Sequence, residues 1–388
     1  MSQLLRSLSV SVIAYDATPL TGTSSAHGGH AARGIGRYVA GVLRALATEQ
    51  ADWAARHLML VGTPATDLGW WPGKVRRTRR SSWRPQDVGW FTTPLLNRLA
   101  LRGCDVVAWH ANDPTAPLGG GVGARTAVTV YDLIPLIDPR VMARIRPHRR
   151  PIYRLYLRQV RRADLVIAIS HVTARQVERL LSIPDERIKV VYPAIEPPGR
   201  AAPDVVIGDH PLDMLFVGVP APHKNPTAAI DALAECRRRG HEISLRFVGP
   251  HPPADRQRLV THAARMGVTR WVEYADRITD ERLQSLYRGS VLLALSDVEG
   301  LGLPPLEALF AGGRVVAGMA ETYAESMGEA VERVDAHDSA AVADAYERAA
   351  AGTAGGPPSD IVARFSPQAS AAASIAAYET LLIAAGAN

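Results

Sequence analysis

Two glutamates stand eight positions apart in the stretch EGLGLPPLEALFAGG, residues 299–313. Glu299 follows the apolar run SVLLALS, which predicts a strand, and the prolines at 304 and 305 are typical of a first helical turn, so Glu307 is expected within that turn. The glycines between the two carboxylates would let the backbone approach a ligand closely. Carboxylates repel phosphate but accept hydrogen bonds from neighbouring hydroxyl groups. The spacing therefore predicts a site for vicinal diols, such as those of a ribose and a hexose.

A lysine occupies a comparable position in VGVPAPHKNPTAAIDAL, residues 217–233. A strand-like run ends at Gly218, and a helix with Pro226 in its first turn follows Lys224. An ammonium group beside a helix N-terminus opposes the helix dipole, so this placement costs free energy unless an anion lies between them. We therefore predict that Lys224 binds a diphosphate, and we favour this over a solvated surface lysine.

A third motif, GGHAARGIGRYVAG (residues 28–41), opens a predicted helix with Gly34 and Gly36. Glycines at a helix N-terminus let backbone N–H groups approach an oxyanion. An anion site and a flexible, glycine-rich helix start explain the pattern equally well. The spacing matches neither a Walker loop nor a dinucleotide fingerprint.

Apolar, β-rich runs alternate with amphipathic helix patterns throughout the chain, which predicts parallel sheets with helices on both faces. The proline-rich stretch at 193–204 predicts a linker. We expect an α/β protein with two doubly wound, Rossmann-like domains facing each other across a cleft, at residues 1–196 and 197–365, and a last helix (366–388) packing back toward the first domain. Ligands of open parallel sheets bind at the carboxyl ends of the strands, which is where the three motifs fall.

Composition excludes several classes of protein. The chain has 47% hydrophobic and 21% charged residues, as a globular protein does, and no apolar run reaches the ~18 residues of a spanning helix. The N-terminal SVSVIAY predicts a first strand rather than a signal peptide. Cys104 and Cys236 form no disulfide framework or metal cluster, and we see no convincing Asp-x-Asp site, so we expect a cytoplasmic protein without a bound metal.

The charge is divided unevenly, with 28 Lys+Arg against 14 Asp+Glu in residues 1–200 and 16 against 24 in residues 201–388. Residues 140–162 hold nine arginines and no acidic residue, and residues 74–84 hold six basic residues. Peripheral contact with an anionic membrane at its inner face, or a phosphate-bearing acceptor, would explain this. A solvated arginine-rich face explains it more cheaply, and we favour that. We expect no nucleic-acid partner, because no recognition motif accompanies the charge.

Several motifs resemble, in order along the chain, those of the retaining GT-B glycosyltransferases usually called family 4. They are GIGRYV, YDLIPL, ADLVIAIS, PHKN and SDVEGLGLPPLEALFAGGRVVAG. The resemblance implies transfer of a hexose from a nucleotide-diphosphate sugar to a hydroxyl acceptor, with retained configuration and no metal or other cofactor. GDP-mannose is the first candidate donor, with UDP- and dTDP-sugars open, and the acceptor stays open among a cell-envelope glycan, a lipid-linked carrier and a small natural product. The donor would lie mainly on the second domain and the acceptor on the first.

The resemblance also implies roles for single residues. Glu307 would bind the ribose hydroxyls, and Glu299 would bind hydroxyls of the transferred sugar, assisted by backbone N–H groups around Gly302 and Leu303. Lys224 would stabilise the charge that develops on the leaving diphosphate.

Other carried-over positions are weaker. His223, at a position that is often arginine in relatives, would share the role of the lysine. Gly34 to Gly36 would close over the phosphates. Tyr131 stands where relatives have a histidine before the aspartate, so Asp132 or His110 is expected to orient the acceptor, with loop capping nearly as good an explanation.

Two further functions remain open from the sequence. A nucleotide-sugar epimerase can use the same architecture, and a non-catalytic, nucleotide-sugar-binding relative is favoured to a modest degree by Tyr131. A glycosidase would also use two carboxylates, but it does not account for Lys224 or for the glycine-opened helices.

Overall fold

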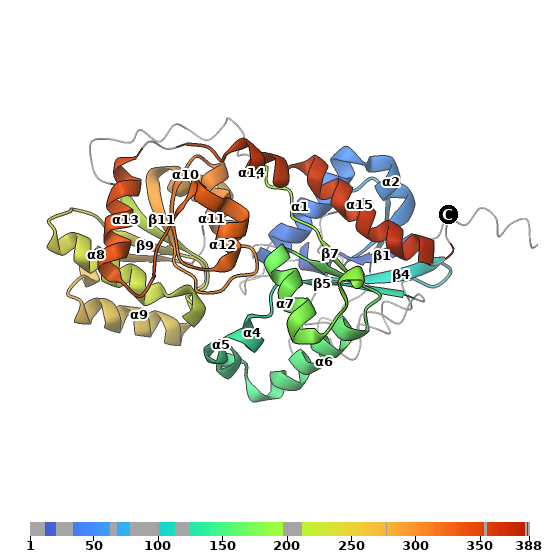
Figure 1. Ribbon diagram of the computed structural model, residues 1–388, viewed down its shortest axis with the longest axis horizontal. Coiled ribbons are helices and arrows are strands. Elements are labelled where there is room, and N and C mark those ends of the chain that lie inside the picture. Colours follow the sequence, from blue (N-terminus) through green and yellow to red (C-terminus); the bar gives the residue numbers. More distant parts are fainter. Residues whose placement is uncertain are drawn as a thin grey trace, which may run out of the picture. The chain divides into compact units, whose positions relative to one another are not determined.

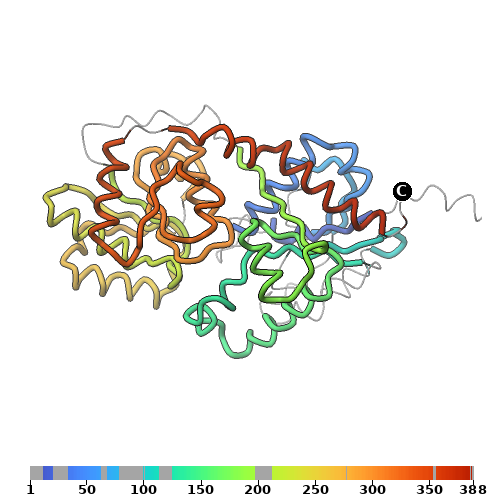
Figure 2. Tube along the Cα trace, viewed as in Figure 1, coloured from blue at the N-terminus to red at the C-terminus, as the bar shows by residue number. Residues whose placement is uncertain are grey.

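The computed structural model describes residues 12–20, 34–62, 68–77, 99, 101–112, 125–196, 212–276, 278–352, 355–384 and 386. The chain divides into two compact units, which are traced in Figures 1 and 2. Unit 1 comprises Met1–Leu133, Ile145–Ala194 and Arg364–Asn388, and unit 2 comprises Ile134–Arg144 and Ile195–Ala363. The second half of the expected linker, 197–204, lies outside the described residues.

Unit 1 is built on a parallel sheet with the strand order β3-β2-β1-β4-β5-β6-β7. Its strands are β1 (Val12–Asp16), β2 (Leu58–Gly62), β3 (Lys74–Arg77), β4 (Val106–Ala111), β5 (Arg125–Val130), β6 (Leu165–Ala168) and β7 (Ile188–Val190). Its helices are η2 (Thr18–Leu20), α1 (Gly34–Glu49), α2 (Ala51–His57), η4 (Pro147–Arg149), α6 (Arg150–Arg162), α7 (His171–Leu181), η5 (Asp185–Arg187) and α15 (Pro367–Ala384). Strands β1, β2 and β6 are buried along their whole length, because helices cover both faces.

Unit 2 has a parallel sheet of order β10-β9-β8-β11-β12-β13. Its strands are β8 (Asp213–Val217), β9 (Leu245–Val248), β10 (Val272–Ala275), β11 (Ser290–Ala294), β12 (Arg314–Ala317) and β13 (Glu332–Arg333). Its helices are α4 (Ile134–Ile137), α5 (Pro139–Arg144), η6 (Pro222–Lys224), α8 (Pro226–Arg238), α9 (Pro253–Arg265), η7 (Thr269–Trp271), α10 (Asp280–Gly289), α11 (Leu303–Phe310), α12 (Glu321–Met327), η8 (Gly328–Ala330), α13 (Ser339–Ala351) and α14 (Ser359–Arg364). Both sheets have the doubly wound order, in which the chain starts at the centre and reverses direction once. The expected α/β fold with two parallel sheets is confirmed.

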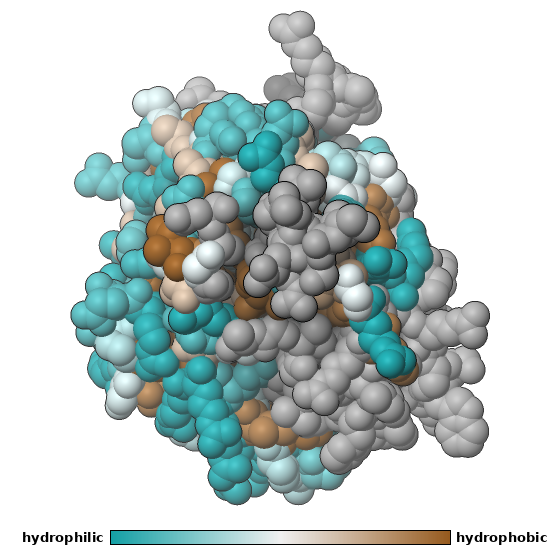
Figure 3. Space-filling model, turned by 90° about the vertical axis from the view of Figure 1, so that its right-hand side faces the viewer, coloured by the Kyte–Doolittle hydropathy of each residue, from teal (hydrophilic) through white to brown (hydrophobic). Residues whose placement is uncertain are grey.

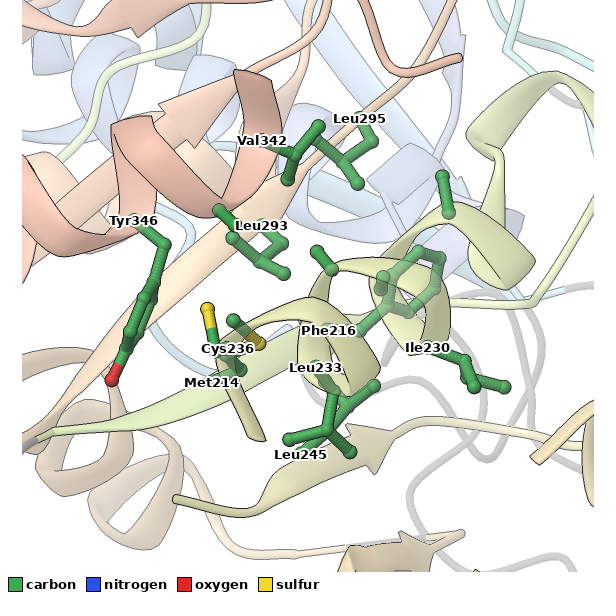
Figure 4. Packing of buried hydrophobic residues seen from close by; sticks show 14 of the residues in the cluster. Met214, Phe216, Ile230, Leu233, Cys236, Leu245, Leu293, Leu295, Val342 and Tyr346 are labelled. Carbon is green, nitrogen blue, oxygen red and sulfur yellow. The ribbon is translucent and has the colours of Figure 1, made fainter. Parts of the chain in front are cut away.

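The core of unit 2 fills the space between its sheet and the helices α8 and α13. Figure 4 shows Leu233 and Cys236 of α8 beside Met214 of β8, and Tyr346 of α13 at the edge of the same cluster. These side chains are 0–1% exposed. The core holds the strand ends in place, so the loops that leave β8 and β11 start from rigid positions.

The segment Ile134–Arg144 packs on unit 2, although β5 before it and α6 after it belong to unit 1. Ion pairs fix it there: Arg140 NH2 lies 3.0 Å from Asp297 Oδ2, and Arg144 contacts the carboxylate of Asp255. The chain therefore passes to unit 2 at Ile134 and returns to unit 1 after Arg144, an excursion that a single boundary near residue 196 does not describe. The alternating sequence pattern did not indicate this excursion, because the segment is too short to show a helical period.

Helix α15 packs against α1 within unit 1, as Figure 1 shows. Ser370 Oγ donates to the carbonyl of Tyr192 at 2.8 Å, and Tyr378 is buried against the sheet. The last helix thereby covers one face of the unit 1 sheet.

No helix in the described part of the chain is long and apolar enough to cross a membrane. Hydrophilic residues predominate among the described residues on the face in Figure 3, with small hydrophobic patches between them. In α6 the arginines at 154, 158 and 161 are exposed, while Tyr156, Leu157 and Val160 are buried.

Candidate functional site

The candidate site of unit 2 lies where the strand order of its sheet reverses, between β8 and β11. The loop after β8 turns at Gly218, with φ +121°, and leads through η6 to Lys224 and α8. The loop after β11 carries Glu299 and ends at Leu303, the first residue of α11. Because β8 and β11 are paired and parallel, both loops leave the same edge of the sheet. The topology therefore brings together two motifs that are 75 residues apart.

Lys224 and Glu299 form an ion pair at this edge, between Nζ and Oε1. Their side chains are 22% and 12% exposed, and Ser296 Oγ donates a second hydrogen bond to Glu299 Oε1 at 2.9 Å. Burial acts to raise the pKa of the Glu299 carboxyl, but the charge of Lys224 and the hydrogen bonds from Lys224 and Ser296 hold it below the ordinary value. Glu299 is therefore ionised at neutral pH and can accept hydrogen bonds from hydroxyl groups.

The anion that offsets Lys224 is thus a residue of the chain. The sequence argument required an anion beside the ammonium group to offset the dipole of α8, and the structure pairs that group with Glu299. A half-buried pair of this kind presents a cation and an acceptor side by side. It suits a ligand with a negative group adjacent to a hydroxyl.

A small cavity of about 20 Å³ adjoins the pair and is lined in part by Ser296, Pro305 and Tyr323. A space of that size holds about one water molecule. Gly302, with φ +84°, packs against Tyr323: a Cβ at this position would lie 2.5 Å from Tyr323 Cε1. Glycine is required at 302 both by its backbone conformation and by the close aromatic ring.

Glu307 lies in the second turn of α11, because the helix begins at Leu303 and its first turn has no acidic residue. The expectation that Glu307 would lie in the first turn is wrong. Its carboxylate accepts a hydrogen bond from the hydroxyl of Tyr287 in α10 at 3.1 Å. Since Pro304 and Pro305 have no N–H, the first turn of α11 offers few backbone donors beyond Gly302 and Leu303. This helix start is a poor cradle for phosphate and fits a neutral sugar better.

Two residues that the sequence did not single out, Asn225 and Asp297, tie the two loops together. Asn225 Nδ2 donates to the carbonyl of Leu295 at 3.0 Å and to Asp297 Oδ1 at 2.6 Å. The N–H of Asp297 donates to the carbonyl of His223 at 2.8 Å. Asn225 has φ +47°, a left-handed conformation that asparagine tolerates better than most residues. In the sequence, its position between Lys224 and the proline that opens α8 could have identified Asn225 as a site residue.

His223 does not act as a second permanent cation. It is buried, and burial lowers the pKa of its imidazole below the ordinary value, so the ring is neutral at pH 7. Its Nδ1 is buried and has no hydrogen-bond partner among the described residues.

The remaining predicted residues belong to unit 1. Gly34 is the first residue of α1, where it is exposed, and Gly36 is buried. The stretch before it, 21–33, lies outside the described residues. Tyr131 is buried, its hydroxyl donates to the carbonyl of Asn112 at 3.0 Å, and Asp132 after it is half-buried.

His110 is part of a buried chain of hydrogen bonds. Tyr378 Oη lies 2.7 Å from Nδ1, and Thr129 Oγ1 lies 2.8 Å from Nε2. Thr129 in turn donates to Asn112 Oδ1 at 2.7 Å, so the threonine accepts from Nε2–H and the tyrosine donates to Nδ1. Both ring nitrogens are satisfied inside unit 1, and the residue is 2% exposed. The expected role of His110 in orienting an acceptor therefore has no geometric support. The imidazole points into the core, where it is hydrogen-bonded to Tyr378, 268 residues away in the sequence.

No group of three or more His, Cys, Asp or Glu side chains in the described ranges could hold a metal ion.

Two family models match the chain in succession. Residues 32–197 match the model for "Glycosyltransferase Family 4", and residues 202–353 match that for "Glycosyl transferases group 1". The first match includes the motifs GIGRYV, YDLIPL and ADLVIAIS, and the second includes PHKN and the stretch with the two glutamates.

Two curated proteins are similar to parts of the chain. The D-inositol 3-phosphate glycosyltransferase of Acidothermus cellulolyticus is 33% identical over 203 residues, which is 48% of this chain and 45% of that protein. The serotype-specific mannosyltransferase WbdA of Escherichia coli is 26% identical over 236 residues, which is 55% of this chain and 28% of that protein. The chain thus spans less than half the length of these curated relatives.

Solved structures resemble the whole chain in fold. A crystal structure of Anabaena Alr3699/HepE in complex with UDP and glucose aligns with a TM-score of 0.63 at 15% identity and covers 97% of this chain and 100% of that one. A sucrose-phosphate synthase from Thermosynechococcus elongatus aligns with a TM-score of 0.66 at 16% identity and covers 97% of each chain. At these identities the likeness establishes the fold alone.

The buried His110 predicts a pH-dependent stability. Burial lowers the pKa of its imidazole to about 3, whereas in the unfolded chain the ordinary value is 6.5. Between these values the unfolded chain binds a proton that the native protein does not, so the free energy of unfolding falls as the pH falls. From pH 7 to pH 5 this one group should remove about 2 kcal/mol. Urea unfolding of wild type and His110→Gln at both pH values measures it; equal losses in the two proteins would contradict the assignment.

Proposed function

We propose that the protein transfers a hexose from a nucleotide-diphosphate sugar to a hydroxyl acceptor. The proposal starts from the family: the chain belongs to the group 1 glycosyltransferases of the GT-B fold. The proposal includes retention of the anomeric configuration and chemistry without a metal ion. The observation that carries it is the half-buried ion pair of Lys224 and Glu299 at the carboxyl ends of β8 and β11.

Lys224 is proposed to bind the diphosphate of the donor. Its side chain is 22% exposed and, within the described part of the chain, its amine is paired with the carboxylate of Glu299, so a phosphate oxygen can replace or join Glu299 as its partner. When the sugar–phosphate bond breaks, negative charge grows on the leaving diphosphate. A fixed cation beside it stabilises that charge more in the transition state than in the ground state.

Glu299 is proposed to hold the transferred sugar. Its hydrogen bonds with described residues, from Lys224 and Ser296, both end on Oε1, which leaves Oε2 to accept from a sugar hydroxyl. The carboxylate stays charged, as its lowered pKa indicates. Backbone N–H groups at Gly302 and Leu303 would complete the sugar site.

Glu307 is proposed to bind the ribose hydroxyls of the donor. Tyr287 already donates to Glu307 Oε2, so the carboxylate is oriented before a ligand arrives. On the acceptor side we retain Asp132 and leave out His110, whose ring nitrogens are both occupied in the core. Retention of configuration follows from the family resemblance; the anomeric form of the product, read by NMR, tests it.

GDP-mannose is the proposed donor, with UDP-sugars as the alternative. A similar curated protein is named as a mannosyltransferase, and a structure of the same fold contains UDP and glucose.

Substitution of Lys224 and of Glu307 should separate their roles. Lys224→Ala should lower kcat by about 10²–10³-fold, because it removes a charge that acts in the transition state. Glu307→Ala should act mainly by raising the KM for the donor, because ribose binding is the same in the ground and transition states. Initial rates with varied donor check both, with Lys74→Ala as an exposed control lysine. Full activity of Lys224→Ala would remove its assigned role.

The donor should stabilise the protein against heat, by an amount that grows with the logarithm of its concentration divided by its Kd. We expect one of the GDP-, UDP-, dTDP- and ADP-sugars to raise Tm well above the others, with and without EDTA, because no step needs a metal. Product analysis of the same mixtures identifies the reaction: conversion of the donor to another sugar nucleotide without an acceptor would indicate an epimerase. Binding without any turnover would indicate a non-catalytic protein.

The arginine face of α6 is proposed to be a solvated surface, not a membrane site. Arg154 and Arg158 are exposed above a helix side that packs into unit 1, and a charged outer face requires no partner. The protein should stay in the supernatant when sedimented with phosphatidylserine vesicles at physiological salt. Sedimentation that the double substitution of Arg154 and Arg158 by glutamate abolishes would instead establish the membrane contact.

A further inference from the structure

The segment Ile134–Arg144 reaches the candidate donor site through one side chain, Arg140. Its guanidinium group is held on one side by Asp138, with Nε 3.1 Å from both carboxylate oxygens and NH2 2.9 Å from Oδ2. On the other side NH2 donates to Asp297 Oδ2 at 3.0 Å. Asp138 is 8% exposed in its side chain, so it fixes the direction in which the guanidinium points.

Asp297 is the point at which three pieces of chain meet. It lies two residues before Glu299, on the loop that follows β11. Asn225 from the β8 loop donates to its Oδ1 at 2.6 Å, and Arg140 donates to its Oδ2. His337 Nε2 lies 3.4 Å from Oδ1 at an exposed position. The loop that carries Glu299 is thus anchored through both oxygens of one carboxylate.

The Arg140–Asp297 pair contributes little to global stability. The two side chains are 52% and 32% exposed, and ion pairs with this much solvent are screened. Arg144 of the same segment makes a different contact: it pairs with Asp255, whose side chain is 2% exposed and which also binds Arg258. Arg144 thus pairs with a buried carboxylate on α9, whereas Arg140 pairs with the partly exposed Asp297, two residues before Glu299.

We propose that Arg140 is a positioning residue for the donor site, which through Asp297 holds the loop that carries Glu299 against Lys224. The inference rests on the proposed function for its effect on catalysis. Without the guanidinium, Asp297 Oδ2 loses this donor, and the Asp297 side chain is held through Oδ1 alone, by Asn225 and the exposed His337. The Glu299 carboxylate then spends less time in the geometry that meets a sugar hydroxyl, and small misplacements of such groups cost large factors in rate.

A purely structural role predicts a different result. If Arg140 only attached the segment to unit 2, its removal would resemble the removal of Arg144: stability would fall, and activity would be lost only where the variant unfolds. If Arg140 positions the loop, its removal lowers activity even in the fully folded variant. The two arginines therefore serve as matched variants on one helix, α5.

The test compares Arg140→Ala, Arg140→Lys, Asp297→Asn and Arg144→Ala in the full chain. Arg140→Ala should lower kcat/KM by about 10–100-fold at a temperature where it is folded, although its urea midpoint falls as well, because the nearly buried Asp138 loses its cation. Arg140→Lys should restore part of the loss, because its charge reaches Asp297 without the bidentate contact to Asp138. Arg144→Ala should lower the urea midpoint and keep kcat/KM within about two-fold of wild type at a temperature where it is folded. The double variant Arg140→Ala/Asp297→Asn should have a kcat/KM no lower than that of the poorer single variant, because both substitutions remove the same Arg140–Asp297 contact.

Backbone hydrogen exchange of residues 296–302 gives a measurement that does not depend on transfer. Arg140→Ala should raise exchange in this loop, and Arg144→Ala should not. Unchanged exchange in Arg140→Ala, or equal falls in activity and stability for the two arginine variants, would overturn the inference. Absence of any transfer by wild type would overturn the proposed function instead, and the exchange result would then still decide whether Arg140 holds the loop.

Discussion

The ion pair of Lys224 and Glu299 is the interaction on which the candidate site depends. Each group alone would be costly at its position, because the ammonium precedes a helix N-terminus and the carboxylate is nearly buried. Together they place a cation and an acceptor at one edge of a rigid sheet. The reversal of strand order between β8 and β11 makes this meeting possible, since it sets two loops that are distant in sequence next to each other.

The polar residues of the two units show how burial separates binding groups from structural ones. In unit 1, Tyr378, His110, Thr129 and Asn112 satisfy one another in a fixed direction, which leaves no capacity for a ligand. At the edge of unit 2, Glu299 keeps an oxygen free of the bonds to Lys224 and Ser296. Residue type therefore does not identify a site in this protein; unused hydrogen-bonding capacity near the surface does.

The excursion of residues 134–144 gives the candidate site a contribution from the first half of the chain. The segment begins two residues after Asp132, at the end of β5, and docks on unit 2 through Arg140 and Arg144. Family matches divide the chain near residue 200, and a division by sequence alone would place this segment with unit 1. Its ion pairs join residues 157 and 111 positions apart, so only the folded chain reveals them.

The sequence by itself determined the alternation of strands and helices and the presence of Lys224 and Glu299 at strand ends, because local periodicity and proline–glycine punctuation act over a few residues. It missed the start of α11 by enough to misplace Glu307, since two prolines in succession fit more than one register of a first turn. Tertiary structure decided that Glu299 is the partner of Lys224, that His110 turns inward toward Tyr378, and that Asn225 and Asp297 join the loops. Such contacts depend on which strands become neighbours and on the register between them, which no short stretch of sequence contains.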